Sequence, residues 1–123
     1  MQISYNTKER YGKIKQPCLK VNLEGRFILN HAAVKMLELE DSHTDGVLFG
    51  YQNGNCYIAY SASPNAYKGN FKKGETAFRF NSKKEALQLL LHFKTDKENL
   101  LIDENNIVVA EAHKFYLLKK YNV

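Results

Sequence analysis

Apolar and polar residues alternate with period two along several short segments of the chain, which is the pattern of half-buried β-strands. In the first part of the chain, the predicted strands cover residues 18–23, 26–29, 47–51 and 56–60. Between the second and third of these, apolar residues recur at helical spacing after Asn30, a favourable N-cap, and predict a helix over 31–39. Asn53-Gly54 predicts a tight hairpin turn between the last two strands, because both central residues of a type I′ turn need positive φ.

The same order of elements returns after a polar loop over 61–74. A strand is predicted over 76–80 and a helix over 83–93, and Ser82 with Glu85 matches the capping box that starts many helices. The segment that follows predicts a loop at 95–99, a hairpin and a last strand. The hairpin strands are expected at 100–103 and 107–110 around Glu104-Asn105-Asn106, and the last strand at 114–120.

Aligning Phe27–Asn30 with Phe78–Asn81 superimposes a strand on a strand and a cap on a cap. The chain therefore reads as a repeat of pattern, with one short helix and one small sheet in each half. We expect an α+β fold in which two similar β-α-β-β halves pack face to face, with small antiparallel sheets and two short helices. The predicted single domain, 1–123, consists of an extended arm up to Pro17, a first half at about 18–61, a basic linker at 62–74 and a second half at about 75–121.

Length and composition fit one ordinary globular domain, because 123 residues with 44% hydrophobic and 12% aromatic content can bury a core without a disulfide or a structural metal. No segment reaches the length of about 20 apolar residues that crosses a bilayer, and the N-terminus has no apolar signal-peptide core. We therefore expect a cytoplasmic protein that makes no membrane contact. In that compartment Cys18 and Cys56 are expected to be free thiols, and Cys56 to be a small buried hydrophobe.

The net charge of +5 is distributed in blocks, with basic segments at 1–20 and 68–84 flanking a mildly acidic unit. The second basic block also carries aromatic residues, and this mixture suits nucleic acid, because cations neutralise phosphates and rings stack on exposed bases. Lys83 and Lys84 at a helix N-terminus oppose the helix dipole, which has a small cost in stability. A contact of these lysines with phosphate would explain why they stand there. The alternative is that Phe78 and Phe80 belong to the core and that the lysines only keep the surface solvated. The candidate residues in this block are Lys68, Lys72, Lys73, Arg79, Lys83 and Lys84.

The order of elements at 21–60 resembles the DNA-binding module of the AbrB/MazE-like transition-state regulators. Gly25-Arg26 leads a strand into the helix, and Asp45-Gly46 and Asn53-Gly54 occupy the positions of the family's turns. The resemblance implies DNA binding, with Arg26 as a basic contact of the first strand, and it covers about a third of the chain. The sequence departs from the family pattern at Asn30, where the family usually has Pro, and in a longer loop before the hairpin.

Other chemistry finds little support in the sequence. The four histidines are not spaced with another histidine, a cysteine or an acid as a metal site requires, and the glycines match neither the Walker nor the dinucleotide pattern. We therefore expect no catalytic residues, no metal and no cofactor. The leading hypothesis is a non-enzymatic interaction or accessory domain for a protein partner, and the alternative is a DNA-binding regulatory module. An enzyme or small-molecule binder is a third, less favoured hypothesis, and a homodimer is left open.

Overall fold

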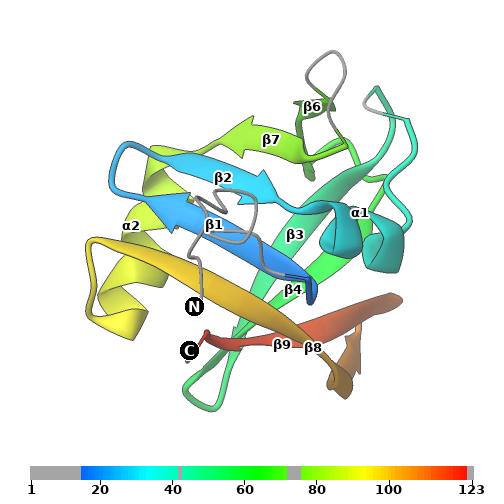
Figure 1. The fold of residues 1–123 in the computed structure, drawn as a ribbon. Coiled ribbons are helices and arrows are strands. Elements are labelled where there is room, and N and C mark those ends of the chain that lie inside the picture. Colours follow the sequence, from blue (N-terminus) through cyan, green and yellow to red (C-terminus); the bar gives the residue numbers. More distant parts are fainter. Residues whose placement is uncertain (1–14, 42, 72–75, 122–123) are drawn as a thin grey trace, which may run out of the picture.

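The computed structural model describes residues 15–41, 43–71 and 76–121 of the chain (Figure 1). Within these ranges, two helices and nine strands follow one another, and all nine strands belong to one sheet. In chain order the elements are β1 (Cys18–Asn22), β2 (Arg26–Leu29), α1 (His31–Leu37), β3 (Gly46–Gln52), β4 (Asn55–Ser61), β5 (Tyr67–Lys68), β6 (Asn70–Phe71), β7 (Phe78–Asn81), α2 (Lys83–Phe93), β8 (Lys97–Ala110) and β9 (His113–Lys120).

The caps predicted from the sequence define where both helices begin. The Asn30 side chain accepts a hydrogen bond from the backbone N–H of Ala33 at 2.9 Å and a second one from the N–H of Cys18 at 3.0 Å, so it also fastens β1 to the start of α1. Ser82 accepts from the N–H of Glu85 at 3.2 Å. The predicted bounds of α2 are confirmed, whereas α1 ends two residues early, where Glu38 takes up the left-handed conformation.

The sheet is antiparallel and bends into a nearly closed barrel with the strand order β5-β3-β4-β9-β8-β1-β2-β7-β6. The two outermost strands of this order, β5 and β6, are neighbours in the chain and only Gly69 separates them. The first of these strands, β5, pairs with β3 through Tyr67 and Val47. The second, β6, pairs with β7 through Phe71 and Phe78. The chain itself therefore joins the two edges of the sheet.

The predicted arrangement of two similar halves with small separate sheets is wrong. Strands make up 52% of the described chain and helices 18%, and strands from both predicted halves alternate in a single sheet. The β8–β9 hairpin lies between β1 and β4, so it separates the two hairpins of the first half. This arrangement is favourable because a nearly closed barrel pairs most of the strand edges that two small sheets would leave open.

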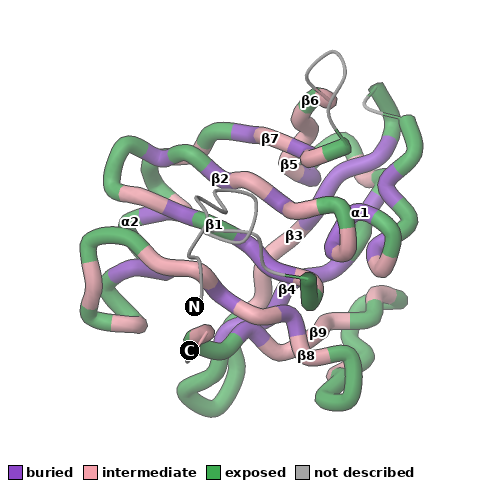
Figure 2. The backbone as a smooth tube through the Cα atoms, viewed as in Figure 1, coloured by how far each residue is buried: buried purple, intermediate pink, exposed green. Residues whose placement is uncertain are grey.

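The two segments that align as a repeat are hydrogen-bonded neighbours. β2 pairs with β7 in an antiparallel register that places Phe27 opposite Phe80, and the two rings stack with centroids 4.7 Å apart. Phe49 and Tyr67 join this aromatic cluster in the barrel interior, with ring centroids 5.9 Å apart. Phe78 and Phe80 are buried, which confirms that they belong to the core. Figure 2 shows buried positions alternating with exposed or half-buried ones along β2.

Both helices pack against β1 and β2, and Figure 1 shows them at opposite ends of this hairpin. At one end, the backbone N–H of Ser82 donates to the carbonyl of Gly25 at 2.8 Å, which joins the start of α2 to the β1–β2 turn. Each helix directs an apolar stripe towards the sheet. The buried helical residues are Ala33, Val34, Leu37, Ala86, Leu89 and Leu90.

The last hairpin is not where the sequence predicts it. Residues 100–110 belong to one long strand, β8, and the Asn-rich segment predicted to be a turn is instead an irregularity between Asp103 and Ile107. Asp103 organises this bulge, because its carboxylate accepts from the N–H of Asn105 at 2.9 Å and from Nδ2 of Asn106 at 2.6 Å. The chain reverses later, at Glu111-Ala112, where both residues have positive φ.

Candidate functional site

The alternation of side chains along β1, β2 and β7 divides the residues of these strands between the core and the outer face of the barrel. Leu19, Val21, Phe27, Leu29, Phe78 and Phe80 point inward and are buried. Their neighbours therefore point outward. These outward residues are Lys20, Asn22, Arg26, Ile28, Arg79 and Asn81.

Strand register arranges these outward side chains in two rows. In the first row, Ile28 lies between Lys20 on one side and Arg79 on the other, and Asn99 and Asn70 extend the row at its ends. In the second row, Arg26 lies opposite Asn81, and on the neighbouring pair of strands Asn22 lies opposite Lys97. The outer face from β6 to the start of β8 thus combines four cations with four asparagines.

This outer basic face is hollowed along its length. A depression of about 640 Å³ contains Arg26, Lys68 and Arg79, at the point where β5 and β6 close the barrel. The next depression, of about 200 Å³, shares Ile28 with it. A third, of about 320 Å³, shares Lys20 and Asn99 with the second. The three hollows therefore adjoin one another across the strands, and together they are called the groove.

Positive charge dominates the groove. Arg26 forms an exposed ion pair with Glu24, with 3.3 Å between Nη2 and Oε2, and ion pairs this exposed contribute little. Lys68 donates from Nζ to the carbonyl of Thr44 at 2.7 Å, so its charge is positioned without being neutralised. Within the described ranges, no carboxylate lies within ion-pairing distance of Lys20 or Lys97.

The structure brings together three of the residues predicted from the sequence and separates others from them. Arg26, Lys68 and Arg79 line the same hollow. Lys83 and Lys84 are exposed at the start of α2, beside the β1–β2 turn. Lys72 and Lys73 lie outside the described residues, as does most of the predicted N-terminal arm.

Sequence reasoning missed Lys20, Lys97 and the four asparagines of the outer basic face. Alternation alone places Lys20 on the outer side of its strand. The pairing of β1 with β8, which brings Lys97 and Asn99 beside it, joins segments about 80 residues apart and has no local signal in the sequence.

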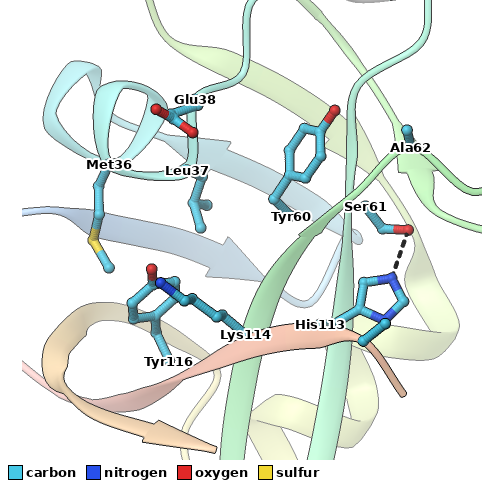
Figure 3. A pocket seen from close by; sticks show the side chains of 10 residues that line it. Met36, Leu37, Glu38, Tyr60, Ser61, Ala62, His113, Lys114 and Tyr116 are labelled. Atoms are coloured by element: carbon cyan, nitrogen blue, oxygen red, sulfur yellow. Dashed lines mark hydrogen bonds between the residues drawn. The ribbon is translucent and has the colours of Figure 1, made fainter. Parts of the chain in front are cut away.

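A separate hollow, of about 390 Å³, lies beside His113, between the end of α1, β4 and β9 (Figure 3). On one side of it, Nε2 of His113 lies 3.2 Å from Oγ of Ser61. A hydroxyl beside an imidazole is the arrangement of an activated nucleophile. Ser61 is only 2% exposed, however. Among the described residues no group hydrogen-bonds to Nδ1 of His113, so the third group that would orient the imidazole in such a site is missing from them.

The loop next to the hollow beside His113 is held by Asp45. Its carboxylate accepts hydrogen bonds from the N–H groups of Glu40 and Asp41 at 2.8 and 2.9 Å and from the hydroxyl of Tyr60 at 2.7 Å. The backbone donors, led by Asp41, lower the pKa of Asp45 below its usual value, and the bond to Asp45 raises the pKa of Tyr60. These bonds all serve to close the loop before β3.

Both cysteines are free thiols, as predicted, and both are buried, which was predicted for Cys56 alone. Burial raises the pKa of each thiol to about 11, so both are protonated at neutral pH and are poor nucleophiles. In the described part of the chain, no group of three or more histidine, cysteine or acidic side chains is arranged to hold a metal ion.

Comparison with protein-family models, with curated proteins and with solved structures returned no match. None of the helices in the described ranges has the length and apolar character needed to span a membrane. The assignment of a function therefore rests on the geometry of the outer basic face and of the hollow beside His113.

Proposed function

We propose that the protein is a non-enzymatic accessory domain that binds double-stranded nucleic acid through the outer basic face. The observation that carries this proposal is the pair of side-chain rows on which Lys20, Arg26, Arg79 and Lys97 meet four asparagines along one groove. Lysine and arginine neutralise phosphates, and asparagine amides donate hydrogen bonds to phosphates and base edges.

The duplex is favoured over single strands by the direction of the aromatic side chains. Proteins that bind single strands stack bases on exposed rings. Here Phe27, Phe78 and Phe80 point into the barrel, and the described residues of the outer rows include no aromatic side chain. Contacts to the phosphate backbone therefore remain as the main source of affinity. The resemblance of 21–60 to AbrB/MazE-like modules supports the same proposal, because Arg26, its basic contact, lies in this groove.

The proposal predicts a steep dependence on salt. Four phosphate contacts give a slope of about −3.6 in log K against log salt, so affinity should fall about 150-fold between 50 and 200 mM salt. In the variant Lys20→Gln/Arg26→Gln/Lys97→Gln, one of the four contacts remains, the slope should be about −0.9, and the fall should be about 3-fold to 4-fold.

Fluorescence anisotropy with a labelled random-sequence duplex measures both slopes. The matched control is Lys35→Gln/Lys94→Gln/Lys114→Gln, which lowers the net charge of +5 by the same three units at exposed lysines on α1, after α2 and on β9. We expect the control to keep a steep slope and at most a small loss of affinity. Equal losses in both variants would show that net charge and not the outer basic face determines binding.

A competition experiment distinguishes nucleic acid from an acidic protein partner. If polyglutamate displaces the duplex at equal charge concentration, an acidic protein partner is favoured instead.

A further inference from the structure

Beyond the bulge, β8 has one edge that no described strand covers. β1 pairs with β8 only as far as Leu101, and the last bond on that side runs from the N–H of Ile102 to the carbonyl of Pro17 at 3.0 Å. From Ile107 to Ala110, β8 pairs only with β9 among the described residues. An uncovered edge of this kind can pair with another strand.

The turn geometry shows which backbone groups face this open edge. Glu111 and Ala112 form a two-residue turn with φ of 49° and 64°, and Ala110 lies opposite His113. The residues that flank a two-residue turn form a hydrogen-bonded pair, and hydrogen-bonded pairs then alternate with non-bonded pairs along the ladder. The N–H and C=O groups of Ile107 and Val109 consequently point away from β9, towards the open edge.

The side chains along this edge are apolar and exposed. Val109 is 70% exposed and Ile107 is 45% exposed, and by alternation both lie on the same face of the strand. Residues 105–110 read Asn-Asn-Ile-Val-Val-Ala, without charge, proline or glycine. Soluble proteins usually protect an edge with a charged residue or a proline, and this segment has neither.

We propose that this open edge pairs with the same edge of a second copy of the chain, antiparallel about a two-fold axis at Val108. In that register Ile107 of each copy lies opposite Val109 of the other, and these are the residues whose backbone groups face outward. The apolar side chains of both copies then meet on one face.

The segment 105–110 carries no charge, so the same segment of a second copy can pair with it without electrostatic repulsion. Pairing about Val108 places Asn106 opposite Ala110, and neither residue is charged, so no like charges face each other.

Analytical ultracentrifugation over a concentration series tests the association. We expect the wild-type mass to rise from 14.2 kDa towards twice that value at high concentration. Val109→Lys should remain monomeric, and the control Leu91→Lys, at an 80% exposed position on α2, should still dimerise. Because both positions are highly exposed, both variants should fold, which circular dichroism checks. A monomeric wild type at all concentrations, or equal association of the two variants, would overturn the proposal.

A cysteine substitution tests the register. Residues directly opposite in a non-hydrogen-bonded pair have Cα atoms about 4.5 Å apart, which a disulfide can bridge. Val108→Cys should therefore form a covalent dimer under mild oxidation, whereas Val109→Cys should do so much more slowly because it lies opposite a different residue. The native Cys18 and Cys56 are buried and should not contribute. Faster cross-linking at Val109 than at Val108 would contradict the proposed axis.

Discussion

Closure of the barrel depends on the absence of a side chain at Gly69. A Cβ atom at this position would lie 2.1 Å from the carbonyl oxygen of Arg79 and 2.9 Å from Cε1 of Phe78, well inside van der Waals contact. The carbonyl belongs to β7, and the neighbouring Asn70 pairs with Arg79, so β6 would have to move away from β7 to accommodate a methyl group. Overpacking of this kind costs about 1–3 kcal/mol, and each hydrogen bond that is lost between β6 and β7 adds about 1 kcal/mol.

We therefore expect Gly69→Ala to lower the free energy of unfolding by about 3–4 kcal/mol, a large part of the stability of a small domain. Urea denaturation followed by far-UV circular dichroism measures this change. Gly54→Ala is the matched control, because it adds the same methyl group in open space at a φ of +79° and should cost only about 1 kcal/mol. If the two variants were equally stable, the close approach of Gly69 to β7, and with it the nearly closed barrel, would be refuted.

Three further predictions concern the turn and the polar clusters. Replacing Glu111-Ala112 by Asn-Gly should raise the free energy of unfolding by about 1–2 kcal/mol, measured by urea denaturation, because both residues have positive φ. Glu85 accepts hydrogen bonds from the hydroxyls of Tyr51 and Tyr67, and burial together with Glu85 raises the pKa of both tyrosines. Because the unfolded chain then loses these protons more readily than the folded one, wild-type stability should fall as pH rises above 10. Thermal melts should show a smaller alkaline fall in Glu85→Gln. The lowered pKa of Asp45 stabilises the fold above about pH 4, so Asp45→Asn should cost about 1–3 kcal/mol at neutral pH and show less acid destabilisation.

Local signals in the sequence predicted the individual elements well. The N-caps Asn30 and Ser82 and the alternation of β1, β2 and β4 are confirmed, because they depend on neighbours within a few residues. The hairpin turn was misplaced for the same reason: Glu104-Asn105-Asn106 carries turn-forming residues, whereas Glu111-Ala112 carries none. A turn formed by unfavourable residues is stabilised by the pairing of its flanking strands, which sequence pattern does not reveal.

The barrel and the groove could not be predicted, because both depend on long-range pairing. β5 and β6 are two residues each, too short to show an alternating pattern, yet they close the sheet. The repeat of Phe27–Asn30 and Phe78–Asn81 suggested two separate halves, although the strands in these segments pair with each other. Part of the groove is nevertheless predictable from the sequence, since charge and the family resemblance point to Arg26, Lys68 and Arg79, which line one hollow.

The most direct test of the proposed function is a map of where a duplex contacts the protein. In a titration of the ¹⁵N-labelled protein with a short random-sequence DNA duplex, we expect amide shift changes to concentrate on β1, β2, β7 and Lys97–Asn99 and to disappear at high salt. Shift changes confined to the hollow beside His113 and Tyr116, or the absence of any change at low salt, would contradict nucleic-acid binding by the outer basic face.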